Sequence, residues 1–273
     1  MYEAYWRLTQ KPFENAADPR FYYPAESHQA ALLKLRYAIE NRRGAALLAG
    51  PSGTGKTLLT TMLRGMLSAQ CKPFVHLVFP QMSSADLLAY LADELDGAGQ
   101  VCETPDVQTS VRRIERFLTA NTAKGQHAIV VVDEAQLLES PQTLETLRLL
   151  LNFEPNGEPA LTLLLVGQTS ILTTVNRIPQ WEERFGVKCL LRAFNESETA
   201  AYVEHRLRVA GSPRSIVEPD ALATLQELTG GIPRRINRLC DLALLVGYAE
   251  EQKMLSASHF ESVCRELVAM TSE

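Results

Sequence analysis

The stretch of sequence that decides the fold is "LLAGPSGTGKTLL", residues 47–59. An apolar run gives way to glycines, a proline and a lysine, and helix-forming residues resume at once. The stretch fits the pattern G-x-x-x-x-G-K-[ST], which is filled by Gly50, Gly55, Lys56 and Thr57. Because the pattern lies between a predicted strand and a predicted helix, we interpret it as a loop that holds phosphates.

The physical basis of this prediction is the way glycines shape the backbone. Glycines let the chain curl so that successive N–H groups point at phosphate oxygens, and the following helix adds the positive end of its dipole. Lys56 would neutralise the β- and γ-phosphates, and the Thr57 hydroxyl would serve Mg²⁺. The predicted nucleotide-binding residues are the whole loop: Gly50, Pro51, Ser52, Gly53, Thr54, Gly55, Lys56, Thr57 and Leu58.

Length and composition are those of an ordinary globular protein. The chain has 273 residues, 46% of them hydrophobic and 22% charged, and its net charge of -5 gives no global attraction to nucleic acid. No apolar run reaches the roughly 18 residues of a membrane span, and the N-terminus lacks the apolar core of a secretory signal. The cysteines lack CxxC spacing and are expected to be free thiols: Cys71, Cys102, Cys189, Cys240 and Cys264. We therefore expect a cytoplasmic protein.

Apolar runs alternate with helical patterns along the first two thirds of the chain. The predicted strands cover residues 45–50, 73–79, 127–136, 161–169 and 187–194. Apolar strands between helices imply a parallel sheet with both faces covered, so the predicted fold class is α/β. After about Arg192 the pattern changes to helices alone. We predict an α/β domain over residues 1–192, with an aromatic N-terminal segment, and a helical domain over residues 193–273.

Two further strand ends carry polar side chains. "AIVVVDEA" ends a buried strand in Asp133 and Glu134, at the edge of the sheet where ligands bind in open α/β folds. Asp133 would hold the Mg²⁺ shell, and Glu134 would orient and deprotonate the attacking water. "LLLVGQTS" places Gln168 directly after the next strand, within reach of a γ-phosphate or its water.

Two arginines are candidates for phosphate contacts from outside the loop. Arg184, in "WEERFG", precedes the last strand and would reach the γ-phosphate of a neighbouring subunit as an arginine finger. In "GGIPRRINR", Arg234 falls in the first turn of a helix, from where it would contact the nucleotide, with Arg235 and Arg238 as alternatives.

Simpler interpretations of these residues stay open. The acids at residues 133–134 are also typical of a solvated strand end, and Gln168 is typical of an ordinary loop start. Arg184 fits a solvated surface residue as well, and two neighbouring acids, Glu182 and Glu183, are available to pair with it. Arg234 fits the basic face of a surface helix.

Together these motifs resemble an AAA+ ATPase, and more closely the general secretion pathway protein A (ExeA-like) type. The resemblance covers nearly the whole chain. The phosphate loop is generic, whereas the opening segment and the "GIPRR" helix are more specific. The segments that carry it are "PFENAADPRFYYPAESHQAALLKLRYAIENRRGAALLAG", "LRLLLNFE", "LLLVGQ", "AAYVEHRLRVAG" and "GIPRRINRLCDLALL".

The resemblance implies an αβα sandwich with strand order 5-1-4-3-2 and a helical lid, and ATP hydrolysis coupled to assembly of a homo-oligomer. It implies that Lys56 and Thr57 serve phosphate and Mg²⁺, that Asp133 and Glu134 are the acidic pair, and that Gln168 is the first sensor. Arg184 would be the finger and Arg234 the second sensor. Phe13 and Tyr22 are candidates to lie against the base, and ordinary packing explains both equally well.

The sequence also departs from that family. Secretion members continue into a transmembrane helix and a peptidoglycan-binding domain, which are not in this sequence. This departure argues against direct cell-wall or outer-membrane assembly work by this polypeptide alone. A glutamine as first sensor is common in this subgroup and less usual across the superfamily.

Four functions compete at this point. The first is an ATPase that remodels a protein partner, with a secretion or envelope system as one setting. The second is an ATP-dependent regulator of transposition that binds DNA without sequence specificity, similar to the Mu B and TniB proteins. Its phosphate contacts would come from two groups of basic residues: Arg112, Arg113 and Arg116, or Arg206, Arg208 and Arg214. A small-molecule kinase is disfavoured because it needs no water-activating glutamate, and a nucleotide-loaded scaffold with scarcely any turnover stays open.

Overall fold

The computed structural model describes residues 1–97, 106–138 and 140–269 and divides into two compact units. The first, called here the sheet unit, comprises Ser27–Gly50 and Leu59–Leu191. The second, the helical unit, comprises Met1–Glu26, Pro51–Leu58 and Arg192–Glu273. The functional division at residue 192 stays a prediction. The boundaries of the two compact units differ from that division, because the N-terminal segment and most of the glycine loop belong to the same unit as the C-terminal helices.

The sheet unit is built on a parallel sheet with strand order β2-β3-β4-β1-β5, which is the predicted order 5-1-4-3-2. The strands are β1 (Ala45–Ala49), β2 (Phe74–Leu77), β3 (Ala128–Val132), β4 (Leu161–Gly167) and β5 (Phe185–Leu190). The central strands β1, β3 and β4 are buried along their whole length, as their continuous apolar sequences predict.

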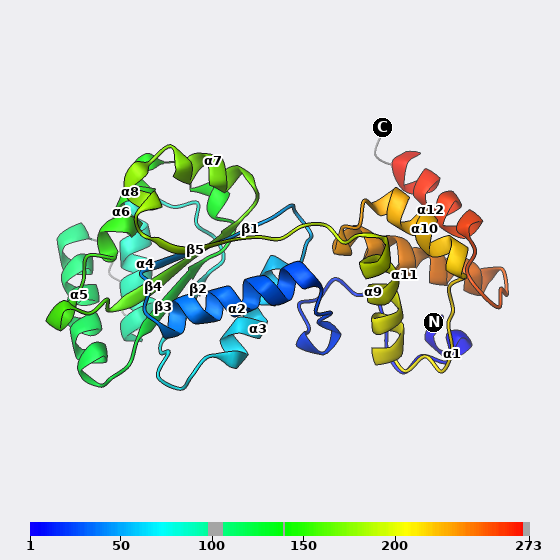
Figure 1. Ribbon diagram of the computed structural model, residues 1–273, viewed down its shortest axis with the longest axis horizontal. Helices are drawn as coiled ribbons and strands as arrows, with labels where there is room; N and C mark the ends of the chain where they lie inside the picture. Colours follow the sequence, from blue (N-terminus) through cyan, green and yellow to red (C-terminus); the bar gives the residue numbers. More distant parts are fainter. Residues whose placement is uncertain (98–105, 139, 270–273) are drawn as a thin grey trace. The chain divides into compact units, whose positions relative to one another are not determined.

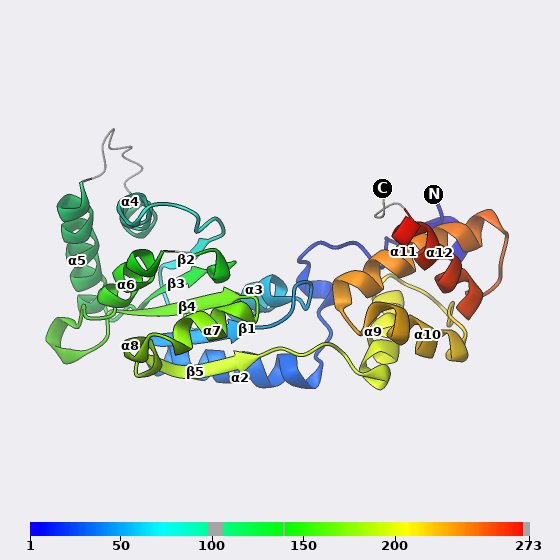
Figure 2. The same cartoon turned by 90° about the horizontal axis from the view of Figure 1, so that it is seen from above.

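Helices cover both faces of this sheet, as Figures 1 and 2 show. One face carries α4 (Ser84–Asp96), α5 (Val107–Ala123), α6 (Pro141–Leu150), α7 (Ser170–Asn176) and α8 (Pro179–Glu182). The other carries α2 (Glu26–Glu40) and α3 (Lys56–Met66). This distribution follows from right-handed crossovers, since only the β1–β2 connection runs toward β2 and the later ones run the opposite way.

The helical unit contains α1 (Glu3–Trp6), α9 (Glu196–Val209), α10 (Pro219–Thr229), α11 (Pro233–Ala249) and α12 (Ala257–Ala269). Helix starts follow local chemistry: Asn195 and Glu198 form a capping box at α9, and Pro233 occupies the first turn of α11. Aromatic residues of the N-terminal segment, among them Trp6, Phe13 and Phe21, are buried in the same core as these helices. Their burial explains why residues 1–26 belong to this unit.

No helix in the part of the chain that the structure describes is long and apolar enough to cross a membrane. Among the predicted free thiols, Cys71, Cys189 and Cys240 are buried and unpaired, and Cys264 is half-buried and unpaired. Cys102 lies outside the described residues.

Candidate nucleotide-binding site

The glycine loop has the curled backbone that the sequence predicts. Gly53 and Gly55 adopt left-handed conformations, with φ of 81° and 91°. The Lys56 ammonium donates to the carbonyl oxygen of Pro51 at 3.0 Å, and the Thr54 hydroxyl donates to the same oxygen at 2.9 Å. Lys56 is 7% exposed. Its positive charge is therefore held over the loop and away from bulk solvent, where an incoming phosphate would meet it.

The start of α11 lies directly against this loop within the helical unit. The N–H of Arg234 donates to the carbonyl oxygen of Gly53 at 3.1 Å. A Cβ added to Gly53 would lie 2.8 Å from the Cβ of Arg234 and 3.2 Å from Cγ2 of Ile232, so only glycine fits here. The structure thus places Arg234 beside the loop with its side chain exposed, and its role as a sensor stays a prediction.

The acidic pair follows β3 in the sheet unit. Asp133 is 3% exposed, its N–H donates to the carbonyl oxygen of Leu77 at 2.8 Å, and its Oδ1 accepts the N–H of Glu134 at 2.9 Å. His76 Nε2 lies 3.4 Å from Asp133 Oδ2. Glu134 is half-buried and adopts a left-handed conformation, with φ of 49°, which is rare outside glycine. The chain therefore turns sharply where the predicted metal ligand and general base stand side by side.

Gln136, which the sequence analysis did not single out, connects this turn to the end of β4. Its Nε2 donates to Glu134 Oε2 at 2.5 Å, and its Oε1 accepts the N–H of Gln168 at 2.9 Å. The side chain of Gln168 itself is exposed. The only trace of this bridge in the sequence is that a glutamine follows two residues after Glu134 and a glycine precedes Gln168. His76 was missed as well, because it occupies an ordinary position in a short strand.

Three of the predicted groups start from one edge of the sheet. Gly50, Asp133 and Gln168 directly follow β1, β3 and β4, and the ends of parallel strands meet at the same edge. Because β4 lies between β1 and β3, the two outer strand ends are about 10 Å apart. The N–H of Gly50 also donates to the carbonyl oxygen of Gly167 at 3.2 Å, which ties the start of the glycine loop to β4.

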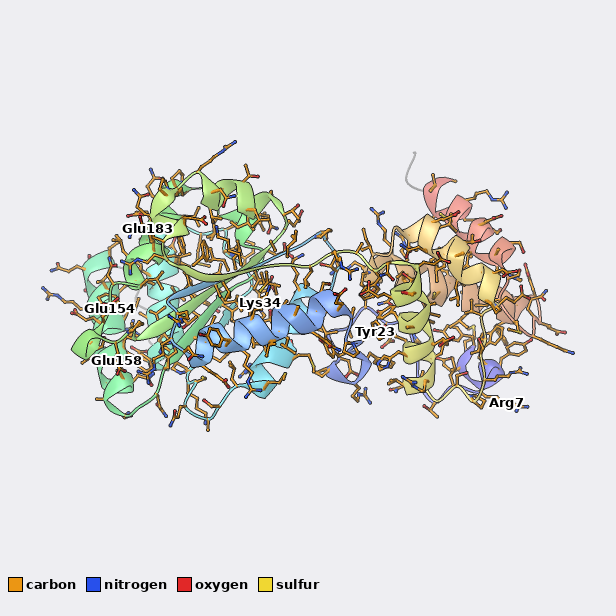
Figure 3. The ribbon with its side chains drawn as sticks, viewed as in Figure 1. Arg7, Tyr23, Lys34, Glu154, Glu158 and Glu183 are labelled. Atoms are coloured by element: carbon orange, nitrogen blue, oxygen red, sulfur yellow. The ribbon has the colours of Figure 1, made fainter. Side chains whose placement is uncertain are left out.

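Arg184 lies at the opposite edge, because it precedes β5. Its Nη2 donates to Asn152 Oδ1 at 2.6 Å, and its Nη1 lies 4.0 Å from a carboxylate oxygen of Glu154, which is labelled in Figure 3. The neighbouring Glu182 pairs instead with Lys188. A strand of this length separates the two edges by about 15 Å or more. Arg184 therefore cannot serve a nucleotide at the carboxyl edge of its own sheet.

Two of the arginines predicted to contact DNA phosphates are bonded to other parts of the protein. The prediction that Arg206 contacts DNA phosphates is wrong, because its side chain is buried within the protein. It is 4% exposed and donates to the carbonyl oxygens of Pro12 and Glu14. Of the other group, Arg113 pairs with two aspartates of α4, Asp93 and Asp96. Arg112, Arg116, Arg208 and Arg214 are exposed, and their DNA contacts stay a prediction.

The aromatic candidates for the base also differ from one another. Phe13 is 2% exposed within the core of the helical unit, as ordinary packing predicts. Tyr22 is half-buried, and burial raises the pKa of its hydroxyl. Its neighbour Tyr23, labelled in Figure 3, packs edge-on against Phe194 and Tyr202. The aromatic opening is thus largely a packing element.

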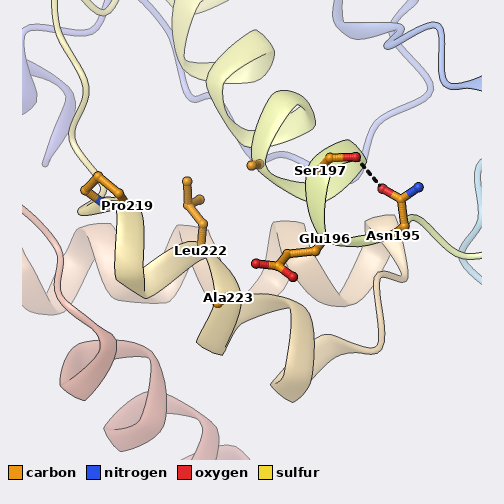
Figure 4. Close-up of a pocket in the computed structure, with 7 residues that line it drawn as sticks. Asn195, Glu196, Ser197, Pro219, Leu222 and Ala223 are labelled. Carbon is orange, nitrogen blue, oxygen red and sulfur yellow. Dashed lines mark hydrogen bonds between the residues drawn. The ribbon is translucent and has the colours of Figure 1, made fainter.

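A pocket of the helical unit, shown in Figure 4, stands apart from these residues. Its polar groups come from the start of α9, where the Ser197 hydroxyl donates to Asn195 Oδ1 at 2.8 Å and the same oxygen accepts the N–H of Glu198. These groups are used in capping the helix. The residues that line the pocket are Asn195, Glu196, Ser197, Ala200, Pro219, Leu222 and Ala223.

The donor set fits Mg²⁺ bound together with phosphates. Among the residues that the structure describes, no cluster of three or more histidines, cysteines or acids is arranged to hold a metal alone. Mg²⁺ is commonly held by one or two protein oxygens plus substrate phosphates and water. The Asp133 carboxylate is an oxygen donor of this kind, and Thr57 is an exposed residue with a hydroxyl; their service to Mg²⁺ stays a prediction. The left-handed glycines of the loop provide the backbone curvature that phosphates need.

Known structures share this fold at low sequence identity. The Aeropyrum pernix ORC2 protein, in complexes with ADPNP and ADP, matches with a TM-score of 0.69 and 19% identity over 94% of this chain and 71% of that one. Drosophila ORC bound to DNA matches with a TM-score of 0.71 and 16% identity, over 98% and 66%. The Thermotoga maritima RuvB Holliday junction branch migration motor matches with a TM-score of 0.59 and 16% identity, over 88% and 69%.

Sequence comparison gives a nearer relative and the family. General secretion pathway protein A of Aeromonas hydrophila is 35% identical over 253 residues, which is 91% of this chain. The chain spans only 45% of the length of that relative. The family model described as "AAA domain" matches residues 39–175, which include the glycine loop, the acidic pair and the end of β4. The chain therefore belongs to the AAA domain family, a family of P-loop ATPases.

Proposed function

We propose that this protein binds ATP with Mg²⁺ in the glycine loop and hydrolyses it with Glu134 as the general base. The observation that carries the proposal is the shared sheet edge. The glycine loop starts after β1, and the acidic pair follows β3, with one strand between them. Lys56 is held over the loop, and Asp133 and Glu134 sit on a sharp turn. Family membership supports the same chemistry.

The residues of the site have distinct roles in this proposal. The loop N–H groups and Lys56 bind the β- and γ-phosphates, and Thr57 and Asp133 hold Mg²⁺, which neutralises phosphate charge when bound. Glu134 orients a water molecule and accepts its proton as the water oxygen bonds to the γ-phosphorus and the bond to the β–γ bridging oxygen breaks. The products are ADP and inorganic phosphate. Gln168 and Arg234 contact the γ-phosphate from β4 and α11.

Arg184 completes a neighbour's site in this account. It lies at the amino edge of its own sheet, so only another copy of the chain brings it to a triphosphate. This position supports an ATP-dependent homo-oligomer in which each subunit donates an arginine finger. The bonds to Asn152 and Glu154 would hold Arg184 in place until that subunit docks.

The kind of protein partner is proposed from the similarity to a secretion protein. The 35% identity to general secretion pathway protein A favours a protein partner that is remodelled or assembled in a secretion or envelope system. Because the chain spans 45% of that relative, the relative's whole activity is not transferred. A cytoplasmic location agrees with unpaired buried cysteines such as Cys189 and Cys240.

The proposal is tested by ATP hydrolysis with Glu134→Gln. We expect this variant to bind ATP like the wild type and to lose turnover by about 100-fold or more, since a general base contributes 10²–10⁴-fold. Arg184→Ala should also bind and fail to hydrolyse, and mixing it with Glu134→Gln subunits should restore activity. Unchanged hydrolysis by Glu134→Gln would remove it as the base. No restoration by mixing, with oligomers intact, would count against a shared site.

A further inference from the structure

The side-chain amide of Gln136 joins the turn after β3 to the end of β4. One end of the amide donates to Glu134 Oε2 at 2.5 Å, and the other end accepts the N–H of Gln168 at 2.9 Å. Both ends of a planar, rigid group are thus used at once. As a result, the Glu134 carboxylate and the backbone that carries Gln168 are positioned by the same side chain.

Gly167 is shaped to admit this amide. A Cβ added to Gly167 would lie 2.7 Å from Gln136 Oε1 and 3.2 Å from the backbone nitrogen of Gln136. Contacts under 3 Å are not tolerated by real side chains unless a neighbour moves, and here the neighbour is the bridging oxygen itself. The glycine at the end of β4 therefore makes room for the bridge.

The bridge acts directly on the side chain of Glu134, the proposed general base. Glu134 is half-buried and lies on a left-handed turn, and its Oε2 accepts the bond from Gln136 Nε2. A carboxylate that is bonded through one oxygen has a defined direction for the other oxygen, Oε1. Misplacement of a catalytic group by about 1 Å costs up to 100-fold in rate.

We propose that Gln136 is a positioning residue for hydrolysis: it fixes the Glu134 carboxylate relative to the end of β4. The absence of a side chain at Gly167 leaves the space that the Gln136 amide occupies. The inference rests on the proposed function of Glu134. Gln136 itself touches neither nucleotide nor water in this account. Gln136 affects the orientation of the base, so its loss should lower kcat and leave the affinity for nucleotide nearly unchanged.

The first experiment compares Gln136→Ala with the wild type and with Gln142→Ala. Gln142 is a matched control, because it is an exposed glutamine of the same unit whose amide bonds to Ser140 near the start of α6. We expect Gln136→Ala to lower kcat by about 10-fold or more, with ATP affinity changed less than about 3-fold. Gln142→Ala should match the wild type. Gln136→Glu keeps the acceptor for the Gln168 N–H but loses the donor to Glu134, so it should be as slow as Gln136→Ala.

A second readout does not depend on turnover. Hydrogen exchange at the Gln168 N–H should become faster in Gln136→Ala, because this N–H loses its acceptor, and stay unchanged in Gln136→Glu. A double-mutant cycle tests the role of Gly167. Gly167→Ala should slow the wild type by about as much as Gln136→Ala does, and should add little in the Gln136→Ala background.

The outcomes separate this inference from the proposed function. Wild-type hydrolysis together with an unchanged kcat in Gln136→Ala would overturn the positioning role and leave the ATPase intact. Additive effects of the two substitutions would overturn the role of Gly167. A third outcome is a wild type that does not hydrolyse ATP, while exchange of the Gln168 N–H still becomes faster in Gln136→Ala. This result would overturn both the proposed function and the positioning role, and the bridge would then be a structural contact alone.

Discussion

His127 shows how burial of one residue sets a pH dependence for the fold. It directly precedes β3, is 3% exposed, and lies 2.8 Å from the Thr162 hydroxyl through its Nε2. Burial, with a smaller contribution from the positive charge of Arg42, lowers the pKa of His127 from its usual value of 6.5 to about 4. The folded protein therefore keeps this imidazole neutral in mildly acidic solution, whereas the unfolded chain protonates it.

The sign of the resulting stability change follows from this difference. Between about pH 6.5 and 4 the unfolded state binds more protons at His127, so the free energy of unfolding decreases as the pH falls. From pH 7 to pH 5 the expected loss from this group is about 2 kcal/mol. In His127→Gln the new amide can also bond to a hydroxyl but does not titrate. This variant should therefore lose about 2 kcal/mol less than the wild type in the free energy of unfolding between pH 7 and pH 5. Denaturant unfolding of both proteins at the two pH values measures it, and equal losses would contradict the assignment.

The roles proposed for single residues differ in how far the sequence predicts them. The glycine loop was recognisable because G-x-x-x-x-G-K-[ST] is a local pattern, and its left-handed glycines follow from local backbone needs. Gln136 was not recognisable, because its role depends on the turn at Glu134 and on the approach of β4, which lies some thirty residues further along the chain. The positions of Arg184 at the amino edge and Arg234 beside the loop agree with the roles predicted for them, and those roles stay predictions.

Among the structural elements, the N-terminal segment is bonded to α9 through a buried cation, Arg206, and through bonds from Thr9 and Gln10 to the end of the helix. The Arg206 guanidinium donates to the carbonyl oxygens of Pro12 and Glu14 and to the Tyr202 hydroxyl. It also lies 4.6 Å from the centre of the Phe21 ring. The segment is otherwise irregular, so these bonds fix a stretch that has little secondary structure of its own.

Arg206→Ala should therefore loosen this segment. The substitution leaves buried carbonyl oxygens without donors and removes a cation–π contact, which predicts a loss of about 2–4 kcal/mol in the free energy of unfolding. Arg208→Ala, on the exposed face of the same helix, is the matched control and should cost less than about 0.5 kcal/mol. Denaturant unfolding, with hydrogen exchange over residues 1–21, measures both variants. Equal stabilities would show that Arg206 does not anchor the segment.

Element prediction worked where the pattern was long and continuous. The buried strands and the long helices were predicted from apolar runs and helical periodicity, because a strand covered on both faces must be apolar throughout. The short helices α1, α7 and α8 were missed, since four to seven residues give too little periodicity. The packing of the N-terminal segment against α9 and α11 was also missed, because it joins residues about 200 positions apart, such as Arg206 and Pro12.

At the scale of the whole molecule, the residues proposed for hydrolysis lie at two opposite edges of one sheet. The carboxyl edge carries the start of the glycine loop, the acidic pair and Gln168, while the amino edge carries Arg184. In the proposed mechanism a single copy of the chain lacks the finger at its own site, so hydrolysis should rise with protein concentration as copies assemble. The ORC and RuvB structures share the fold that has these two edges.

The most direct test of the central claim is calorimetric titration of the folded protein with ATP in the presence of Mg²⁺. The account predicts saturable binding to one site per chain, and a 10- to 100-fold weaker affinity for Lys56→Ala, because a charge-assisted bond to phosphate contributes about 1.5–3 kcal/mol. Glu134→Gln should bind like the wild type. No heat of binding for the wild type, or an unchanged affinity in Lys56→Ala, would contradict a triphosphate site built on the glycine loop.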